Sequence, residues 1–285
     1  MSIKLNNAIA FNVYSKYAES TTNLQKSMSR LASGEKSVED DGAGVAISER
    51  MRSQARSTAM ARQNTEGALS VLQTADSWLQ RINNMLARMH ELSVEANDGT
   101  KTDTDQSNIT AEFDALQSEI KRITEGDAGQ DNAAAKYNTR NLLNGTFSMV
   151  GSTVIGVQVG ADAGQTIAIQ ISSFSVAAAG DFSIANLSLS TPADAAVAIS
   201  NLQTAVNMVA SERATVGGQQ NRFSHTRASL LAYEDNIRAA ESKIRDVDMA
   251  RETSEMAKQQ ILSQVGTAML AQANQLPGAV MQLLG

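Results

Sequence analysis

Apolar residues recur every three or four positions along most of the chain, which is the spacing of one face of an α-helix. The pattern runs through residues 1–41, with one gap of seven around Thr21, and returns from Gly44 until NDGT at 97–100 interrupts it. A helix of about fifty residues would be about 80 Å long. The pattern therefore predicts a helix at the N-terminus, followed by a second and much longer one.

A third helix is expected after the short interruption. Asp103 followed by Gln106 resembles a capping box, which marks a helix start. The apolar face of this helix would consist of Ile109, Phe113, Leu116, Ile120 and Ile123. Because the connection is short, the third helix should run antiparallel to the long one.

The spacing changes to two between about 140 and 190. VIGVQVG (154–160) and TIAIQIS (166–172) alternate apolar residues with polar or small ones, and the glycine-containing GADAGQ (160–165) separates them. These segments predict a β-hairpin. DFSIANLSLS (181–190) is a candidate for a third strand. After Pro192 the helical spacing resumes and continues past GGQQ to Val247.

The sequence therefore predicts a mainly α protein. Its N- and C-terminal segments would form a long antiparallel helical rod or coiled coil, and a small β-hairpin would lie in the middle of the chain. The expected segments are an N-terminal helix at 1–42, N-terminal rod helices at 43–140, a short β-rich insert at 141–192, a C-terminal rod helix at 193–244 and a C-terminal helix at 245–285.

The two ends of the chain are matched in charge. Residues 259–285 contain no charged side chain, and residues 1–41 contain five basic and five acidic ones. Each segment has an apolar stripe, so the simplest arrangement pairs them. A pair of helices buries too little surface to offset backbone ordering, which costs about 1 to 2 kcal/mol per residue. The termini are therefore expected to be largely disordered in the isolated protein and to order when neighbouring copies supply more surface.

Eleven apolar residues are candidates for such an assembly interface, although each alone is equally consistent with an ordinary core position. They are Leu5, Ile9, Val13, Leu24, Met28, Leu31, Ile261, Val265, Met269, Leu276 and Leu284. Pro277 follows Leu276 directly. Since an interior proline removes a hydrogen bond and costs about 3 kcal/mol, the C-terminal helix is expected to end or kink near Leu276.

Composition excludes several classes of function. The 285 residues include one Trp and no Cys, and the formal net charge is −6. Disulfides, iron–sulfur clusters and thiol catalysis are therefore excluded, and nucleic acid is an unlikely partner. His90 and His225 are isolated, and the nucleotide-binding, zinc-protease and serine-hydrolase motifs are absent. We expect no enzyme activity, no cofactor and no metal.

Membrane insertion is not expected either, because no stretch approaches the roughly 20 apolar residues of a membrane span. The first residues lack the basic start and apolar core of a cleavable signal peptide. A protein with this N-terminus would have to leave the cell by another route.

The stretch EDDGAG (39–44) places three carboxylates beside two glycines. Glu39, Asp40 and Asp41 are adjacent, without the ligand spacing of a calcium loop. Carboxylates are favourable at the positive end of the long helix that follows. We interpret the stretch as a joint between two helices, in which Gly42 and Gly44 let the chain turn.

Four segments resemble bacterial flagellins. They are LQKSMSRLASGEKSVEDDGAGVAISERMRSQ (24–54), RQNTEGALSVLQTADSWLQRINNMLARMHELSVEANDGT (62–100), YNTRNLLNGTF (137–147) and ESKIRDVDMARETSEMAKQQILSQVGTAMLAQANQLPGAVMQLLG (241–285). The resemblance covers most of the chain outside about 148–195, and both ends match in order and length. Because the middle is short, the chain resembles a minimal flagellin.

The resemblance implies a structural subunit of the flagellar filament for swimming motility. Such subunits leave the cell unfolded through the type III export apparatus of the flagellum, bind an export chaperone through the C-terminal segment, and polymerise under a cap protein. The terminal helices would form the inner tube of this secreted homopolymer and the central helices its outer tube. The alternatives are a hook–filament junction protein and a helical signalling protein.

Some flagellins are bound by the innate receptor TLR5 through the long rod helix and the helix after it. By motif, Arg88 and Leu92 in LARMHELSVEAND and Glu112 in TAEFDAL match the recognised positions. His90 stands where a basic residue is usual. Without the resemblance, Arg88 and Glu112 are ordinary exposed charges and Leu92 continues the apolar stripe.

Overall fold

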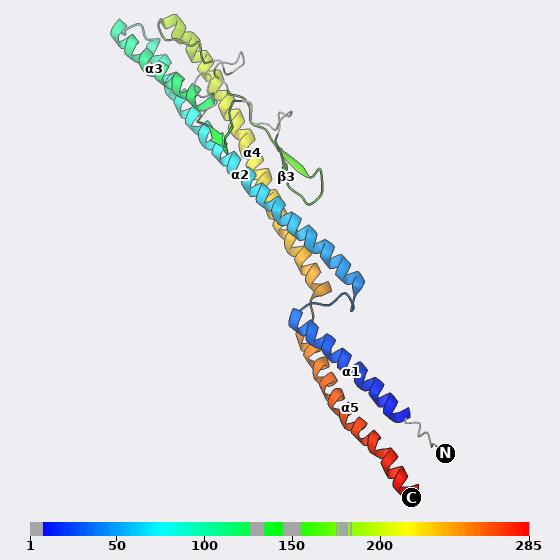
Figure 1. The fold of residues 1–285 in the computed structure, drawn as a ribbon. Coiled ribbons are helices and arrows are strands. Elements are labelled where there is room, and N and C mark those ends of the chain that lie inside the picture. Colours follow the sequence, from blue (N-terminus) through cyan, green and yellow to red (C-terminus); the bar gives the residue numbers. More distant parts are fainter. Residues whose placement is uncertain are drawn as a thin grey trace. The chain divides into compact units, whose positions relative to one another are not determined.

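The computed structural model describes residues 8–125, 134–144, 155–174, 176, 182 and 184–284, with side chains between residues 11 and 275. Within these residues the chain is mainly helical, as predicted. Figure 1 shows the helices α1 (Ala8–Ser33), α2 (Gly42–Ala96), α3 (Asp103–Thr124), α4 (Pro192–Arg245) and α5 (Met249–Leu284).

The chain divides into two compact units. The terminal unit comprises Met1–Ala55 and Asp235–Gly285, and the central unit comprises Arg56–Glu234. Helices α2 and α4 are therefore each divided between the units. The five segments expected from the sequence, with boundaries at 42 and 244, stay a prediction.

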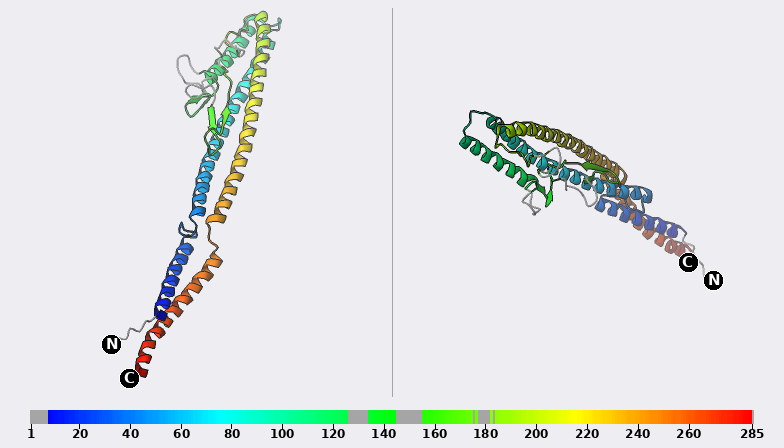
Figure 2. Two further views of the ribbon diagram at one scale, coloured as in Figure 1. Left: turned by 90° about the vertical axis from the view of Figure 1, so that its right-hand side faces the viewer. Right: turned by 90° about the horizontal axis from the view of Figure 1, so that it is seen from above.

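The central unit contains an apolar core between the helices. Figures 1 and 2 show α3 beside α2, with α4 along the same part of α2. Apolar residues at helical spacing meet there, because each helix turns one stripe towards the others. The fully buried residues include Leu72, Leu79, Ile82, Leu86, Met89, Phe113, Ile120, Leu202, Val209, Val216 and Phe223.

Helix α3 begins with a capping box, one residue earlier than predicted. The hydroxyl of Thr102 accepts a hydrogen bond from the Asp105 backbone N–H at 3.3 Å, and the Asp105 carboxylate accepts one from the Thr102 N–H at 3.1 Å. The predicted pair of Asp103 and Gln106 is wrong because the extended residue at the cap is Thr102. The Gln106 amide instead donates to the carbonyl of Leu189.

The predicted β-hairpin is confirmed. Strands β3 (Ile155–Gln158) and β4 (Thr166–Ile169) pair antiparallel, with Ile155 opposite Ile169. Helix side chains hold the hairpin, since the Asn64 amide donates to the Gln158 carbonyl at 3.2 Å. The candidate third strand at 181–190 is wrong for the described residues there, which form no strand; Phe182, Ile184 and Leu189 instead bury their side chains in the core.

A second, shorter hairpin precedes the first. Strand β1 (Lys136–Tyr137) pairs with β2 (Arg140–Asn141) across a two-residue turn. Both turn residues are left-handed, with φ of 46° at Asn138 and 67° at Thr139. Two positive φ angles define a type I′ turn, which matches the twist of a tight hairpin.

In the terminal unit, α1 and α5 lie side by side and run antiparallel, as Figures 1 and 2 show. Helix α5 continues past Pro277 to Leu284, so it does not end near Leu276, and the alternative of a kink there stays a prediction. A proline removes its own N–H donor but leaves the hydrogen bonds of the flanking turns in place. Among the described residues, no helix combines the length and apolarity needed to cross a bilayer.

Candidate assembly surface

The seam between α1 and α5 is built largely from small and polar residues. Its positions alternate steps of three and four, which is the spacing of a coiled-coil seam. The least exposed side of each helix consists of Tyr17, Ser20, Leu24, Ser27 and Leu31 on α1, and of Gln259, Ser263, Gly266, Leu270 and Ala273 on α5.

Small residues bring the two helices close together at this seam. A Cβ atom on Gly266 would lie 3.0 Å from Cδ2 of Tyr17. The Ser20 hydroxyl lies 3.1 Å from both the backbone carbonyl and the side-chain oxygen of Gln259, to either of which it can donate. Buried polar groups are tolerated when they are hydrogen-bonded in this way. At Ser20, Gln259 and Gly266, small and polar groups therefore take the place of large apolar side chains.

Several large apolar side chains of the two helices lie outside the seam and are exposed. The exposed fractions are 73% for Phe11, 60% for Ile261, and 51% for both Val265 and Met269. Among the described side chains of the terminal unit, the buried apolar residues are two alanines, Ala55 and Ala273. The described part of the terminal unit thus lacks an apolar core like that of the central unit.

A groove of about 510 Å³ runs between α1 and α5. Its apolar lining comes from Val13 and Tyr17 on one helix and from Leu262, Val265 and Met269 on the other. Charged residues at its rim include Lys16, which pairs with Glu19 at 2.8 Å. The apolar part of this groove suits apolar side chains of another protein chain.

The eleven residues predicted for assembly lie in different places. Met28, Ile261, Val265 and Met269 are exposed, whereas Val13, Leu24 and Leu31 are half-buried. Leu5 lies outside the described residues, as do the side chains of Ile9, Leu276 and Leu284. Their common role in assembly stays a prediction.

The sequence reasoning predicted that the terminal helices pair, and it named Leu24 and Leu31, but it missed the small and polar positions of the seam. The missed residues are Ser20, Ser27, Gln259, Gly266 and Ala273, together with the exposed Phe11, Tyr14 and Leu262. One sequence signal could have revealed these positions. Gln259, Gly266 and Ala273 are seven residues apart, so they occupy the same position of successive heptads, and none of them is a large apolar residue.

The two connections of the terminal unit are hydrogen-bonded to each other. Glu35 and Asp246 form an antiparallel bridge, in which the Lys36 N–H donates to the Arg245 carbonyl at 2.8 Å. The Val247 N–H donates to the Gly34 carbonyl at 3.0 Å. Gly34 has a φ of 73°, which ends α1 in a left-handed turn that glycine adopts without strain.

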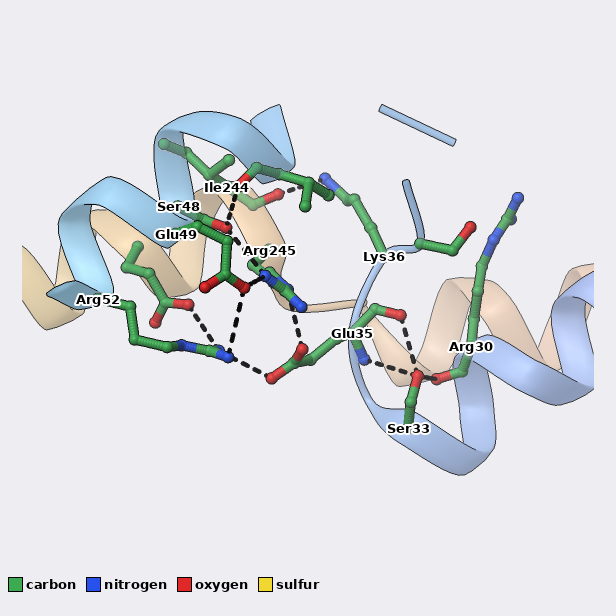
Figure 3. A network of polar contacts seen from close by, with 12 residues as sticks. Arg30, Ser33, Glu35, Lys36, Ser48, Glu49, Arg52, Ile244 and Arg245 are labelled. Carbon is green, nitrogen blue, oxygen red and sulfur yellow. Dashed lines mark hydrogen bonds and ion pairs between the residues drawn. The ribbon is translucent and has the colours of Figure 1, made fainter. Parts of the chain in front are cut away.

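Ion pairs surround this backbone bridge (Figure 3). Glu35 pairs with Arg52 at 2.9 Å and with Arg245 at 2.8 Å. Arg52 also pairs with Glu241 at 2.9 Å, and Arg245 pairs with Glu49. We call this set of five residues, Glu35, Glu49, Arg52, Glu241 and Arg245, the clasp. The clasp joins three parts of the chain: the connection that follows α1, the first turns of α2 and the end of α4.

In EDDGAG, Asp41 rather than a glycine organises the start of α2. Its carboxylate accepts a hydrogen bond from the Gly44 N–H at 2.8 Å, which caps the helix. Gly42 and Gly44 lie in the first turn of α2, and neither has a positive φ. A Cβ on Gly44 would lie 2.2 Å from Asp41 Oδ2, so this glycine makes room for the cap. The role of both glycines as a joint stays a prediction.

Asp40 binds back to α1. The Arg30 guanidinium donates to both carboxylate oxygens, at 2.9 Å from Nε, and pairs with Glu252 of α5 at 3.3 Å. The Arg30 hydrogen bonds hold the pKa of Asp40 well below its usual range, and hydrogen bonds from Ser37 add to this effect. In the described parts of the chain, no three His, Cys, Asp or Glu side chains are arranged to hold a metal ion.

The candidate TLR5 residues lie in the central unit. Arg88 and Glu112 form a two-point ion pair between α2 and α3, at 2.8 and 3.1 Å, which lowers the pKa of the Glu112 carboxyl. Leu92 is only 1% exposed and belongs to the core. Of the three candidate residues, Arg88 and Glu112 are therefore exposed to a partner, whereas Leu92 packs beneath the surface.

The fold and this surface define a class: a helical structural protein whose N- and C-terminal helices pair and leave large apolar side chains exposed. Residues 5–148 match the bacterial flagellin N-terminal helical region, and residues 199–284 match the C-terminal helical region. The chain belongs to the bacterial flagellin family. It is a structural subunit of the flagellar filament.

Relatives cover the chain almost completely. It is 38% identical to a flagellin of Bacillus subtilis and 36% identical to one of Halalkalibacterium halodurans, and in each case the match covers 98% of both chains. Identity is 37% to a flagellar filament 33 kDa core protein of Treponema phagedenis, over 97% of this chain and 99% of the relative.

A solved structure described as a flagellar hook-associated protein of Vibrio parahaemolyticus is also similar. The TM-score is 0.59 at 15% identity, and the match covers 73% of this chain and 100% of the other. Similarity at this identity concerns the fold alone. It gives no support to the hook–filament junction as the function of this chain.

Proposed function

We propose that subunits polymerise through the exposed apolar side chains of α1 and α5. Neighbouring copies would then supply the apolar core that the described part of the terminal unit lacks. The observation that carries this proposal is the absence of large buried apolar side chains among the described residues of that unit. Covering a Val, Ile or Met side chain contributes about 1.5 to 3 kcal/mol.

The distribution of charge supports the same surface. Burying an unpaired ion costs several kcal/mol. An interface that every subunit of a polymer buries should therefore contain few charges. From Gln259 onward α5 carries none. In a head-to-tail contact that does not close into a ring, one face of a subunit binds a different face of the next subunit. The α1–α5 pair has both a groove and exposed apolar side chains, which could serve as two such faces.

The proposal includes a route and partners for the free subunit. We infer that it leaves the cell through the type III export apparatus of the flagellum and joins the extracellular filament beneath a cap protein. An export chaperone would cover the exposed Ile261, Val265 and Met269 until assembly. Arg88 and Glu112 are the proposed positions for contact with the receptor TLR5. Polymerisation of this kind needs no cofactor or catalytic residue.

The direct test is a pair of matched substitutions. Val265→Asp places a charge on the proposed surface, and Val197→Asp places one on α4 in the central unit, where Val197 is 57% exposed. We expect Val265→Asp to raise the critical concentration for polymerisation at least tenfold, because a charge would be buried without a partner, and Val197→Asp to change it less than threefold.

Sedimentation of salt-induced filaments gives the critical concentration, and circular dichroism of the free subunit checks that both variants keep the central helices. Filaments of normal length and yield from Val265→Asp would exclude this surface. Equal loss in both variants would instead indicate a general effect of added charge.

A further inference from the structure

Methionines are unevenly distributed over the surface. The chain has twelve Met and no Cys, so thioethers are its only sulfur groups. Four of the described methionines are about half exposed: Met28 at 47%, Met60 at 58%, Met249 at 50% and Met269 at 51%. Three of these four lie in the terminal unit. Exposed thioethers are the side chains most open to two-electron oxidants in a chain without thiols.

Met269 differs from the other three in its surroundings. It lines the groove between α1 and α5, one and two turns along α5 from Val265 and Leu262. The chain around it, from Gln259 onward, is uncharged. Met60 lies on α2 in the central unit and Met28 and Met249 are outside the groove lining.

We propose that Met269 is an oxidation site, at which conversion of the thioether to the sulfoxide disables the assembly surface of the free subunit. The inference rests on the proposed function of that surface. With hydrogen peroxide as the oxidant, the sulfur takes one oxygen atom and loses two electrons, the O–O bond breaks, and water leaves. A methionine sulfoxide reductase would reverse the change.

The physical effect follows from polarity. A sulfoxide is a strong hydrogen-bond acceptor, and burying it without a donor incurs its full desolvation cost. Its groove neighbours along α5, Leu262 and Val265, offer no side-chain donor. The two lysines of the groove lining, Lys16 and Lys258, are already paired with Glu19 and Glu255. The filament should therefore lose affinity for the modified subunit, whereas a subunit already assembled has Met269 covered and should resist oxidation.

The experiment uses the full chain and hydrogen peroxide. Free subunits and assembled filaments are treated, the peroxide is removed, sulfoxides are mapped by mass spectrometry, and critical concentrations are measured by sedimentation. Met269→Leu keeps size and apolar character, and Met60→Leu is the matched control at an equally exposed site outside the terminal unit.

We expect treated wild-type protein and treated Met60→Leu to show critical concentrations raised about tenfold, which corresponds to about 1.4 kcal/mol. Treated Met269→Leu should stay within threefold of its untreated value. In filaments, Met269 should be oxidised at least several times more slowly than in free subunits.

Two results would overturn the inference. One is normal polymerisation of wild-type subunits in which mass spectrometry finds Met269 fully oxidised. The other is an equal loss of polymerisation in treated Met269→Leu. Failure of the proposed function itself is distinguishable, because Val265→Asp would then polymerise normally without any oxidant.

Discussion

The ionised carboxylate of Asp40 holds the connection between α1 and α2 through hydrogen bonds. Its side chain is 14% exposed and accepts hydrogen bonds from the Arg30 guanidinium and from the N–H and hydroxyl of Ser37, at 3.0 and 2.8 Å. These bonds favour the ionised carboxyl and lower its pKa in the folded state. Protonation of Asp40 would remove the charge that Arg30 binds.

This lowered pKa predicts a pH dependence of filament stability. An unfolded Asp has a pKa of about 3.9, so in the range just below that value the unfolded chain binds a proton that the folded chain does not. The stabilisation by Asp40 is therefore present above about pH 4 and is lost as the pH falls towards the lower folded pKa. Asp40→Asn should lower the dissociation temperature at pH 6 and approach wild type near pH 2.

Scanning calorimetry of filaments between pH 2 and pH 6 measures the difference between the two proteins. Asp114→Asn, which removes an exposed carboxylate of α3, is the control for the loss of a negative charge elsewhere in the chain. A difference between Asp40→Asn and wild type that does not vary with pH would mean that the Arg30 contact does not form in the filament.

At the residue scale, sequence could predict Asp41 as part of a helix start, because acids before an apolar-periodic segment are a common cap signal. It could not predict the partners of Asp40 or of the clasp. Arg30 and Glu252 are 222 positions apart, and no local pattern relates them. Nor did any pattern single out Gly34, the left-handed residue at the end of α1.

At the scale of elements, the separation of α1 and α5 depends on Gly266. The nearest atom to a Cβ at this position is Tyr17 Cδ2, at 3.0 Å, which is tighter than an ordinary van der Waals contact. Gly218 on α4 is also helical, yet a Cβ there would have nothing within 4 Å. The two glycines therefore allow the same substitution to be compared at a crowded and at an open site.

Gly266→Val should destabilise the α1–α5 pair by about 1 to 3 kcal/mol, because the added methyl groups force the helices apart or displace Tyr17. Gly218→Val should change stability by less than about 0.5 kcal/mol. The dissociation temperature of filaments and the unfolding temperature of free subunits measure the two effects. A Gly266→Val filament as stable as wild type would show that the seam is wider than in this structure.

Periodicity predicts the existence and type of elements because it depends only on which side of an element is buried. It identified the helices and the hairpin of Ile155 and Ile169 correctly. It failed at DFSIANLSLS, where alternating apolar residues are buried as an irregular segment whose side chains fill the core. It also missed the small and polar positions of the seam, because residues such as Ser20 and Ala273 carry no hydrophobic signal.

At the scale of the whole molecule, the two units differ in where their apolar side chains lie. The central unit buries residues such as Leu79, Leu86 and Phe113 completely, and the described part of the terminal unit buries only alanines among its apolar residues. A helix pair without a core gains little from tertiary packing, which supplies most helical stability in proteins. The central claim is that neighbouring subunits stabilise α1 and α5.

Amide hydrogen exchange of the free subunit and of the filament tests this claim most directly, since it reports the local free energy of opening along the chain. The account predicts that amides of residues 11–33 and 249–275 exchange rapidly in the free subunit and become protected in the filament, while those of residues 79–92 are protected in both states. Terminal amides already as protected in the free subunit as those of residues 79–92 would contradict it.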